Sequence, residues 1–240
     1  MLRNLNKVVS LTRKAIEEYD MVDENDRIAV GVSGGKDSLV LLAALAELSH
    51  YHPKNFTVFG ISLDMGFGGD FLPIQKFAEE LGVEYYVKKT NFKEIIFDIR
   101  KESNPCSLCA KMRRGALKDM AAEPGSRKVA LGHHNDDVLE TFFLSLLYEG
   151  RVSCFAPVTY LDRTGVTQIR PMIYVPERDI RGVVKHGGVP VAKSMCPADG
   201  ATKREQMKEI IKRLERETTP GLKKRLFHAV RASKIEGWKL

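Results

Sequence analysis

The chain has 240 residues, of which 43% are hydrophobic and 29% charged, and its formal net charge is +7. This balance is typical of a folded globular protein and argues against a largely disordered chain. No run of about 18 apolar residues occurs, which excludes a membrane-spanning helix, and the N-terminus lacks the apolar core of a secretory signal. We therefore expect a cytoplasmic protein.

Apolar residues at helical spacing predict a helix within residues 1–24. From residue 26 onward, short apolar runs alternate with helical patterns. They predict strands over 26–32, 56–63, 83–87 and 128–131, and helices over 39–48, 74–81, 91–100, 112–122 and 138–148. After Gly150 several prolines make the pattern irregular, apart from a predicted helix over 177–185 and two closing helices that separate at residues 220–221.

The alternation of strands and helices predicts an α/β fold, with a doubly wound, mostly parallel sheet and a helical C-terminal extension. We expect an N-terminal helix over 1–24, a main domain over 25–195 and a basic helical tail over 196–240. In doubly wound sheets, ligands bind beyond the carboxyl ends of the strands. The residues that follow the strands are therefore the first candidates for a functional site.

A glycine-containing loop joins the first predicted strand to the next helix. Its glycines let backbone N–H groups approach an anion, and the helix that follows points its positive N-terminus at the same place. The spacing differs from the Walker and G-x-G-x-x-G loops, and an ordinary strand–helix turn needs fewer polar groups. The candidate phosphate-binding residues are Gly31, Ser33, Gly34, Gly35, Lys36, Asp37 and Ser38.

Two further segments follow strands and should reach the same edge of the sheet. Leu63 closes the second strand, where backbone groups can receive an adenine ring. The candidates after the fourth strand are Gly132, His133, Asp136 and Asp137. Adjacent carboxylates can hold Mg²⁺ or orient ribose and phosphate, although capping of the next helix is the alternative role of the two aspartates.

The chain has four cysteines, and we expect no structural disulfides because they are rare in cytosolic proteins of this size. Cys106 and Cys109 are one turn apart and precede a predicted helix, whose N-terminus favours anionic sulfur. Cys154 and Cys196 stand alone. The spacing leaves three alternatives open: a redox dithiol, half of a zinc site, or part of an iron–sulfur site.

The excess positive charge lies at the end of the chain. Residues 201–240 contain 12 Lys and Arg against 5 Asp and Glu, so the first 200 residues are neutral overall. A localised basic segment indicates a polyanionic partner, although a solvated helix face is the alternative. The candidate cations for contact with a nucleic acid are Lys223, Lys224, Arg225 and Arg231.

The loop Ser33-Gly34-Gly35-Lys36-Asp37-Ser38 resembles the SGGKDS signature of the PP-loop (N-type) ATP pyrophosphatases. The resemblance implies an adenine nucleotide alpha hydrolase-like fold and cleavage of ATP between its α and β phosphates. A substrate oxygen is adenylated, pyrophosphate leaves, and AMP leaves later. A loop that holds pyrophosphate stabilises that leaving group, and Asp37 is a candidate ligand for Mg²⁺.

The order of motifs over roughly residues 25–205 resembles one branch of this superfamily, the tRNA thiolation enzymes. The PP-loop is followed by Pro-Cys-x-x-Cys with Arg113 and Arg114, then Gly-His-His-x-Asp-Asp, then a late cysteine. The pattern is most similar to the tRNA 2-thiocytidine synthetase (TtcA) type and related to the 2-thiouridine (TtuA) type. The resemblance implies a 4Fe–4S cluster on Cys106, Cys109 and Cys196, and Cys154 matches no ligand position. Around Cys196 the sequence has Cys-Pro, as in the thiouridine relatives.

The resemblance implies an enzyme that adenylates the C2 oxygen of an anticodon-loop cytidine and replaces it with sulfur. The implied catalytic residues are Lys36, Asp37, Asp136 and Arg114, with ATP, Mg²⁺ and the cluster as cofactors. The implied partners are tRNA, a cysteine desulfurase or another sulfur donor, and a second copy in a homodimer. The alternatives are thiolation of a tRNA uridine, a cluster-free PP-loop amidotransferase or ligase, and an RNA-binding or electron-transfer iron–sulfur protein without catalysis.

Overall fold

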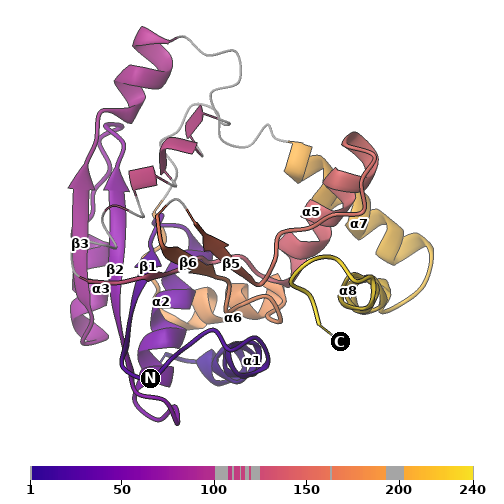
Figure 1. Cartoon of the computed structure of the whole chain (residues 1–240), viewed down its shortest axis with the longest axis horizontal. Helices are drawn as coiled ribbons and strands as arrows, with labels where there is room; N and C mark the ends of the chain where they lie inside the picture. Colours follow the sequence, from indigo (N-terminus) through magenta and orange to yellow (C-terminus); the bar gives the residue numbers. More distant parts are fainter. Residues whose placement is uncertain are drawn as a thin grey trace.

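The structure is a computed structural model, and its elements alternate along the chain as the sequence predicts (Figure 1). It describes residues 2–100, 108–109, 111–113, 115–116, 119, 125–162, 164–192 and 203–239. The strands are β1 (Asp26–Gly31), β2 (Phe56–Asp64), β3 (Glu84–Lys89), β4 (Lys128–Ala130), β5 (Val158–Leu161) and β6 (Val166–Ile169). The helices are α1 (Leu5–Glu18), α2 (Lys36–Ser49), α3 (Leu72–Glu80), the π-helix η1 (Glu94–Ile99), α5 (Asn135–Tyr148), α6 (Glu177–Gly187), α7 (Lys203–Glu217) and α8 (Leu222–Ala232).

The described strands form one sheet in the order β3-β2-β1-β4-β6-β5. Every neighbouring pair is parallel except β5 and β6, which pair antiparallel. The strand order reverses between β1 and β4, and this switch point is where open α/β sheets bind ligands. The mostly parallel α/β fold is confirmed, and the β5–β6 hairpin is an element that the sequence analysis did not predict.

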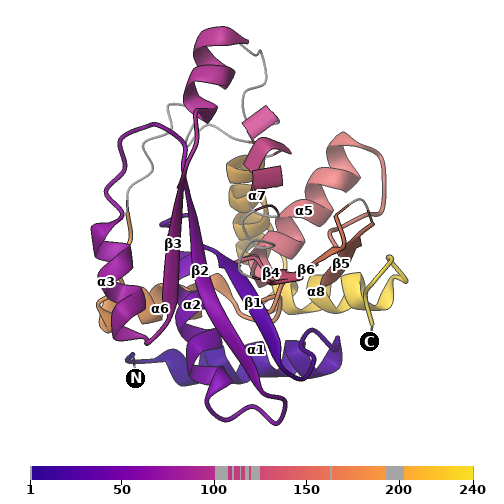
Figure 2. The same cartoon turned by 60° about the vertical axis from the view of Figure 1, so that its left-hand side comes forward.

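The larger core lies on one face of the sheet, where α1, α2 and α6 pack against one another (Figure 2). Alternate residues of a strand point to opposite faces, so Ile28 and Val30 enter this core while Ala29 enters a smaller cluster on the other face. Helix α2 is buried along nearly its whole length. This burial fixes the N-terminus of α2 at the sheet edge where β1 ends.

The closing helices α7 and α8 pack beside α5 rather than extending into solvent (Figures 1 and 2). Val230 of α8 and Trp238 belong to the same core as α1 and α2. The predicted break between the two helices is confirmed, since α7 ends at Glu217 and α8 begins at Leu222. The predicted helix over 112–122 lies largely outside the described residues. Of the described helices, none is both long and apolar enough to span a bilayer.

Candidate active site

The phosphate loop is the short turn between β1 and α2. Gly34 has a positive φ of 82°, and an added Cβ there would meet Ala192 Cβ at 3.2 Å. Ser38 fixes the turn because its Oγ donates to Gly35 O at 2.9 Å and accepts the Ser33 N–H at 3.1 Å. Helix α2 begins at Lys36 rather than at residue 39, so Lys36, Asp37 and Ser38 lie in its first turn. The helix N-terminus therefore points at the loop, which suits an anion.

The end of β4 approaches this turn closely at Gly132. A Cβ added at Gly132 would lie 3.0 Å from both Asp37 C and Ser38 N, which are backbone atoms that cannot move aside cheaply. Only glycine fits there without displacing the first turn of α2. The close approach brings the segment after β4 against the phosphate loop, as the sequence analysis expected.

A cavity of about 300 Å³ lies between these segments. Two predicted motifs and the end of β2 contribute to its wall, together with Met65 and Arg113. The predicted ATP-site residues that line it are Gly31, Ser33, Asp37, Ser38, Leu63, Gly132, His133 and Asp137. Gly34 and Gly35 complete the loop beside it. The structure thus brings together residues more than 100 positions apart in the chain.

His133 and His134 have different surroundings. His133 packs on Phe155 with ring centroids 4.9 Å apart, and its buried Nδ1 has no hydrogen-bond partner among the residues that the structure describes. Burial lowers the pKa of His133 to about 4, so the imidazole is neutral at pH 7. His134 is the N-cap of α5 and forms a capping box with Asp137, whose Oδ2 accepts the His134 N–H at 2.9 Å. The capping role considered for Asp137 is therefore present, and Asp137 also faces the cavity.

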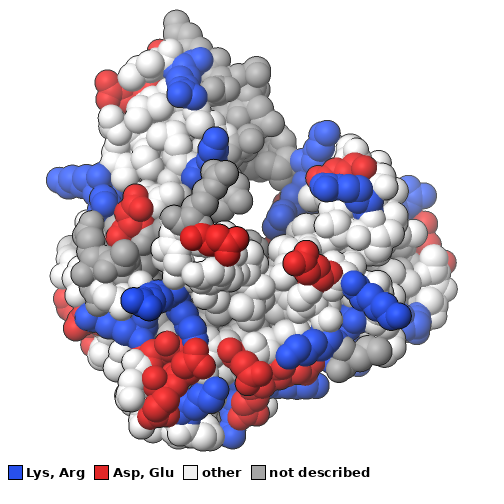
Figure 3. Space-filling view, viewed as in Figure 1, with Lys and Arg blue, Asp and Glu red and all other residues white. Residues whose placement is uncertain are grey.

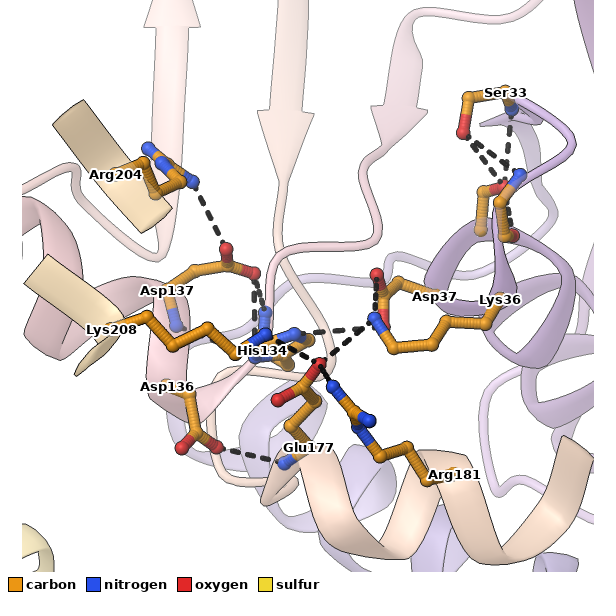
Figure 4. A network of polar contacts seen from close by, with 12 residues as sticks. Ser33, Lys36, Asp37, His134, Asp136, Asp137, Glu177, Arg181, Arg204 and Lys208 are labelled. Atoms are coloured by element: carbon orange, nitrogen blue, oxygen red, sulfur yellow. Dashed lines mark hydrogen bonds and ion pairs between the residues drawn. The ribbon is translucent and has the colours of Figure 1, made fainter. Parts of the chain in front are cut away.

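An ion network adjoins the cavity and connects the loop to α6 and α7 (Figure 4). Lys223 extends the network to α8. Lys36 Nζ lies 2.9 Å from Asp37 Oδ2 and 3.1 Å from Glu177 Oε1. Burial lowers the pKa of Lys36, but hydrogen bonds and charge from Asp37 and Glu177 outweigh it and raise the pKa overall. Burial raises the pKa of Glu177, and Lys208, Arg181 and Lys36 reverse this and hold it at about 2.

Asp136 points away from the cavity into the same network. Its Oδ2 accepts the Glu177 N–H at 2.8 Å, and its Oδ1 lies 2.6 Å from Lys223 Nζ. Asp137 Oδ1 lies 3.0 Å from Arg204 Nη1. Glu177 and Arg204 belong to no motif, so the sequence alone does not identify them as site residues. Among the described residues, no group of three or more His, Cys, Asp or Glu is arranged to hold a metal ion.

The cysteines of the expected cluster are described only in part. Cys109 is half-buried and its Sγ lies 3.9 Å from Sδ of Met65, a residue of the cavity wall. Cys106, Cys196 and Arg114 lie outside the described residues. The Ala192 N–H donates to Gly34 O at 3.0 Å, so the chain passes the phosphate loop four residues before Cys196. The Met65 thioether in the cavity wall and the Cys109 thiol behind it are soft sulfur groups, which fit an iron–sulfur centre better than a hard cation.

Cys154 is separate from this group. Its thiol donates to Val138 O at 3.4 Å, and burial raises its pKa to about 12. A thiol that stays protonated at neutral pH is neither a nucleophile nor a ready metal ligand. This is consistent with the absence of Cys154 from the expected ligand set.

The four cations predicted to contact tRNA have different environments. Lys223 pairs with Asp136, and Arg231 Nη2 lies 2.6 Å from Glu18 Oε1 on α1. Lys224 and Arg225 are exposed on α8. Figure 3 shows Lys and Arg side chains over the α7 and α8 side of the molecule, with a few carboxylates among them. The predicted RNA contact thus has two exposed candidates and two that stabilise the fold.

A parallel α/β sheet with a glycine loop, a buried helix N-terminus and a cavity at the switch point defines a nucleotide-binding protein that uses a phosphate loop. A family model described as a PP-loop domain matches residues 5–214. A protein of Citrifermentans bemidjiense named tRNA-cytidine(32) 2-sulfurtransferase is 38% identical over 90% of this chain and 86% of its own length. A protein of the same name from Geotalea uraniireducens is 37% identical over 95% of this chain and 92% of its own length. The chain belongs to the PP-loop family that contains these sulfurtransferases.

Solved structures agree with this assignment. The U34-tRNA thiolase NcsA from Methanococcus maripaludis, solved with its [4Fe-4S] cluster, superposes with a TM-score of 0.75. It is 28% identical, and the match covers 97% of this chain and 81% of that one. The NMN synthetase of Francisella tularensis, 12% identical with a TM-score of 0.55, shares the fold alone. The predicted resemblance to PP-loop tRNA thiolation enzymes is confirmed.

Proposed function

We propose that this chain is an ATP-dependent tRNA sulfurtransferase that replaces the C2 oxygen of an anticodon-loop cytidine with sulfur. The observation that carries the proposal is that the phosphate loop and two sulfur side chains lie together. The wall of one cavity combines the phosphate loop, through Ser33 and Asp37, with Met65, whose sulfur lies 3.9 Å from the thiol of Cys109. Nucleotide and sulfur chemistry therefore belong to one place, as base thiolation requires. Relatives that are 36–39% identical and named for cytidine 32 support cytidine as the substrate base.

The phosphate loop supplies the first half of the reaction. The C2 oxygen attacks the α-phosphorus of ATP, a P–O bond to the β-phosphate breaks, and pyrophosphate leaves as an anion. Lys36, the loop N–H groups and the N-terminus of α2 stabilise the charge that develops on pyrophosphate. Asp37 supplies a carboxylate for Mg²⁺, which binds proteins through one or two carboxylates plus substrate phosphates. Asp136 positions the N-terminus of α6 through the Glu177 N–H.

Sulfur enters in the second half of the reaction. In our proposal Cys106, Cys109 and Cys196 hold a 4Fe–4S cluster, which would supply activated sulfur beside the adenylated base. Sulfur attacks C2 and the C2–O bond breaks, so that AMP leaves with the original oxygen. Arg113 lines the cavity and can offset the charge of AMP, and Arg114 remains a catalytic candidate from the sequence. Neutral His133 can hydrogen-bond the base or the nucleotide without adding charge.

The same proposal includes partners and cellular location. A cysteine desulfurase or another sulfur donor replenishes the sulfur, tRNA contacts the basic α7 and α8 region, and the enzyme acts in the cytoplasm as a homodimer. Size-exclusion chromatography with light scattering tests the dimer, because a single monomeric species would contradict it.

The proposal is tested by mass spectrometry of tRNA nucleosides after anaerobic reaction of the purified enzyme with ATP, Mg²⁺, sulfide and tRNA. We expect 2-thiocytidine together with AMP and pyrophosphate. Formation of 2-thiouridine instead would favour the second candidate, uridine thiolation, which the U34 thiolase neighbour supports. Protein that lacks iron–sulfur absorption but ligates or amidates a substrate with ATP would contradict thiolation altogether.

A further inference from the structure

Glu177 connects the phosphate loop to the basic helix α7 through a single atom. Its Oε1 lies 3.1 Å from Lys36 Nζ, 2.9 Å from Arg181 Nη2 and 3.0 Å from Lys208 Nζ. The carboxylate side chain is 9% exposed, and its low pKa keeps it charged throughout the neutral range. Figure 4 shows Lys36 and Arg181 converging on this carboxylate from α2 and α6. Three cations thus compete for one negative charge.

Lys36 is the cation in this group whose position matters for the chemistry. Its amine faces Glu177 and Asp37, and it is not among the residues that line the cavity. To contact pyrophosphate or ATP, the Lys36 amine has to give up part of its pairing with Glu177. The carboxylate therefore opposes phosphate binding at the loop, and it does so more strongly when fewer other cations share it.

We propose that Glu177 is a positioning residue for Lys36. It holds the lysine amine away from the phosphates, and the amine pairs with Glu177 again when pyrophosphate leaves. Lys208 of α7 sets the strength of the Lys36–Glu177 ion pair. This inference rests on the proposed use of ATP. The two states are Lys36 on Glu177 and Lys36 on the nucleotide. Lys208 biases them because it shares the Glu177 oxygen.

The test is calorimetric titration of the purified, cluster-loaded enzyme with magnesium pyrophosphate. For Glu177→Gln we expect pyrophosphate to bind about fivefold more tightly, the scale of one partly buried ion pair, and turnover to fall because the product leaves more slowly. A residue that merely supported the loop would give the opposite sign, weaker binding. Asp179→Asn is the matched control, since it removes the same charge from the same helix at a residue paired with Lys7. Equal tightening in both variants would overturn the inference.

A second variant tests the coupling from the other side. Lys208→Gln leaves Glu177 with fewer partners, so Lys36 is held more firmly and pyrophosphate should bind about threefold more weakly. Lys212→Gln is the control, because this lysine lies one turn further along α7 and pairs with exposed Glu209. If Lys208→Gln binds like Lys212→Gln, the coupling is refuted. If the wild-type enzyme binds neither ATP nor pyrophosphate, the proposed function fails; if it binds them and Glu177→Gln binds no more tightly, only this inference fails.

Discussion

At the scale of single residues, the site depends on two glycines as much as on its charged side chains. Gly132 allows the segment after β4 to touch the first turn of α2, and Gly34 allows the left-handed turn of the loop. Around these glycines stand four carboxylates, Asp37, Asp136, Asp137 and Glu177, each paired with a cation. The site therefore couples close backbone contact to a compensated set of charges.

The first prediction concerns Gly132→Ala. The new methyl would lie 3.0 Å from the backbone of Asp37 and Ser38, so the α2 N-terminus and the loop must shift. We expect ATP affinity to fall at least about tenfold, the effect of a change near 1.4 kcal/mol, while the protein remains folded. Gly182→Ala on α6 is the control, since its added methyl would meet no described atom within 4 Å apart from adjacent residues and the backbone of its own helix. Equal ATP affinities in a fluorescence titration of both variants would contradict the prediction.

The second prediction concerns pH and Glu140. Burial raises the pKa of Glu140 to about 7, and the Asp137 carboxylate adds to the shift. The same group titrates near 4.3 in an unfolded chain. Between about pH 4.3 and 7 Glu140 is protonated in the folded protein but ionised in the unfolded chain. The free energy of unfolding therefore falls as pH rises, and above about pH 7 the folded protein bears the full cost of a buried Glu140 carboxylate.

Glu140→Gln should therefore be more stable than wild type at pH 8, by about 1–3 kcal/mol, and equally stable at pH 4.5. Urea denaturation of both proteins across this range measures the difference. A wild-type stability that stays flat from pH 5 to 8, or a variant that shows the same decline, would contradict the assignment of the titration to Glu140.

How much of the site the sequence predicts depends on whether a residue belongs to a compact motif. The motif residues Ser33, Asp37, Gly132 and Asp137 were all identified, and the structure places them around one cavity. Glu177 and Arg204 were missed, since their importance comes from long-range contacts that no local spacing reveals. Asp136 was expected at the nucleotide, yet its oxygens face Lys223 and the Glu177 N–H. Adjacent residues on a helix point in different directions, which motif reasoning alone does not resolve.

At the scale of elements, the buried α/β core was predictable and the hairpin was not. The strands β1 and β2 are apolar runs bounded by turns, and their predicted boundaries differ from those observed by a single residue. The strands β5 and β6 have four residues each, with Pro157 directly before β5 and Pro171 soon after β6, so their pattern is too short to distinguish from a loop. The helix expected over 91–100 contains the π-helix η1, a geometry that no periodicity rule predicted.

The last turn of the chain shows how one element supports the site from a distance. Trp238 Nε1 donates to Phe155 O at 3.0 Å, and its ring packs edge-on against Tyr19 and Phe227. Phe155 in turn lies beneath His133. The C-terminal segment therefore contributes to the common core and also supports one wall of the cavity.

The third prediction follows from this packing. Trp238→Ala removes a large buried ring and leaves the Phe155 carbonyl without this donor, so we expect the free energy of unfolding to fall by about 3 kcal/mol or more. Trp238→Phe keeps most of the ring contact and loses the hydrogen bond, for which we expect about 1 kcal/mol. Chemical denaturation followed by circular dichroism gives both values. A loss below 1 kcal/mol for the alanine variant would show that the last turn is not part of the core.

At the scale of the whole molecule, the charge distribution separates cations that hold the fold from cations available to a partner. Residues 201–240 contain the entire positive excess, yet Arg204, Lys208, Lys223 and Arg231 are paired with carboxylates of other elements. Sequence counting cannot make this distinction, because pairing depends on which helices meet. The surface that we propose for tRNA is the exposed side of α7 and α8 (Figure 3).

The fourth prediction uses salt dependence to test that surface. Removing Lys224 and Arg225 together should weaken tRNA binding and reduce the slope of log affinity against log salt by about two, because each lost phosphate contact removes about one released counterion. Thermal stability should change little, since both side chains are exposed and Arg225 loses only exposed hydrogen bonds to the carbonyls of Thr219 and Pro220. Arg231→Ala should behave differently: it loses the Glu18 ion pair and a hydrogen bond to Lys239 O, so the protein becomes less stable.

A charge-matched control separates a specific surface from overall charge. The double variant Lys76→Ala and Lys185→Ala removes two exposed cations from α3 and from the last turn of α6, outside the surface of α7 and α8. Long-range attraction alone would give the two double variants similar losses of affinity at low salt. A local contact would give a reduced slope only for Lys224 and Arg225. Filter binding at several salt concentrations distinguishes these outcomes, and equal slopes would mean that tRNA docks elsewhere on the protein.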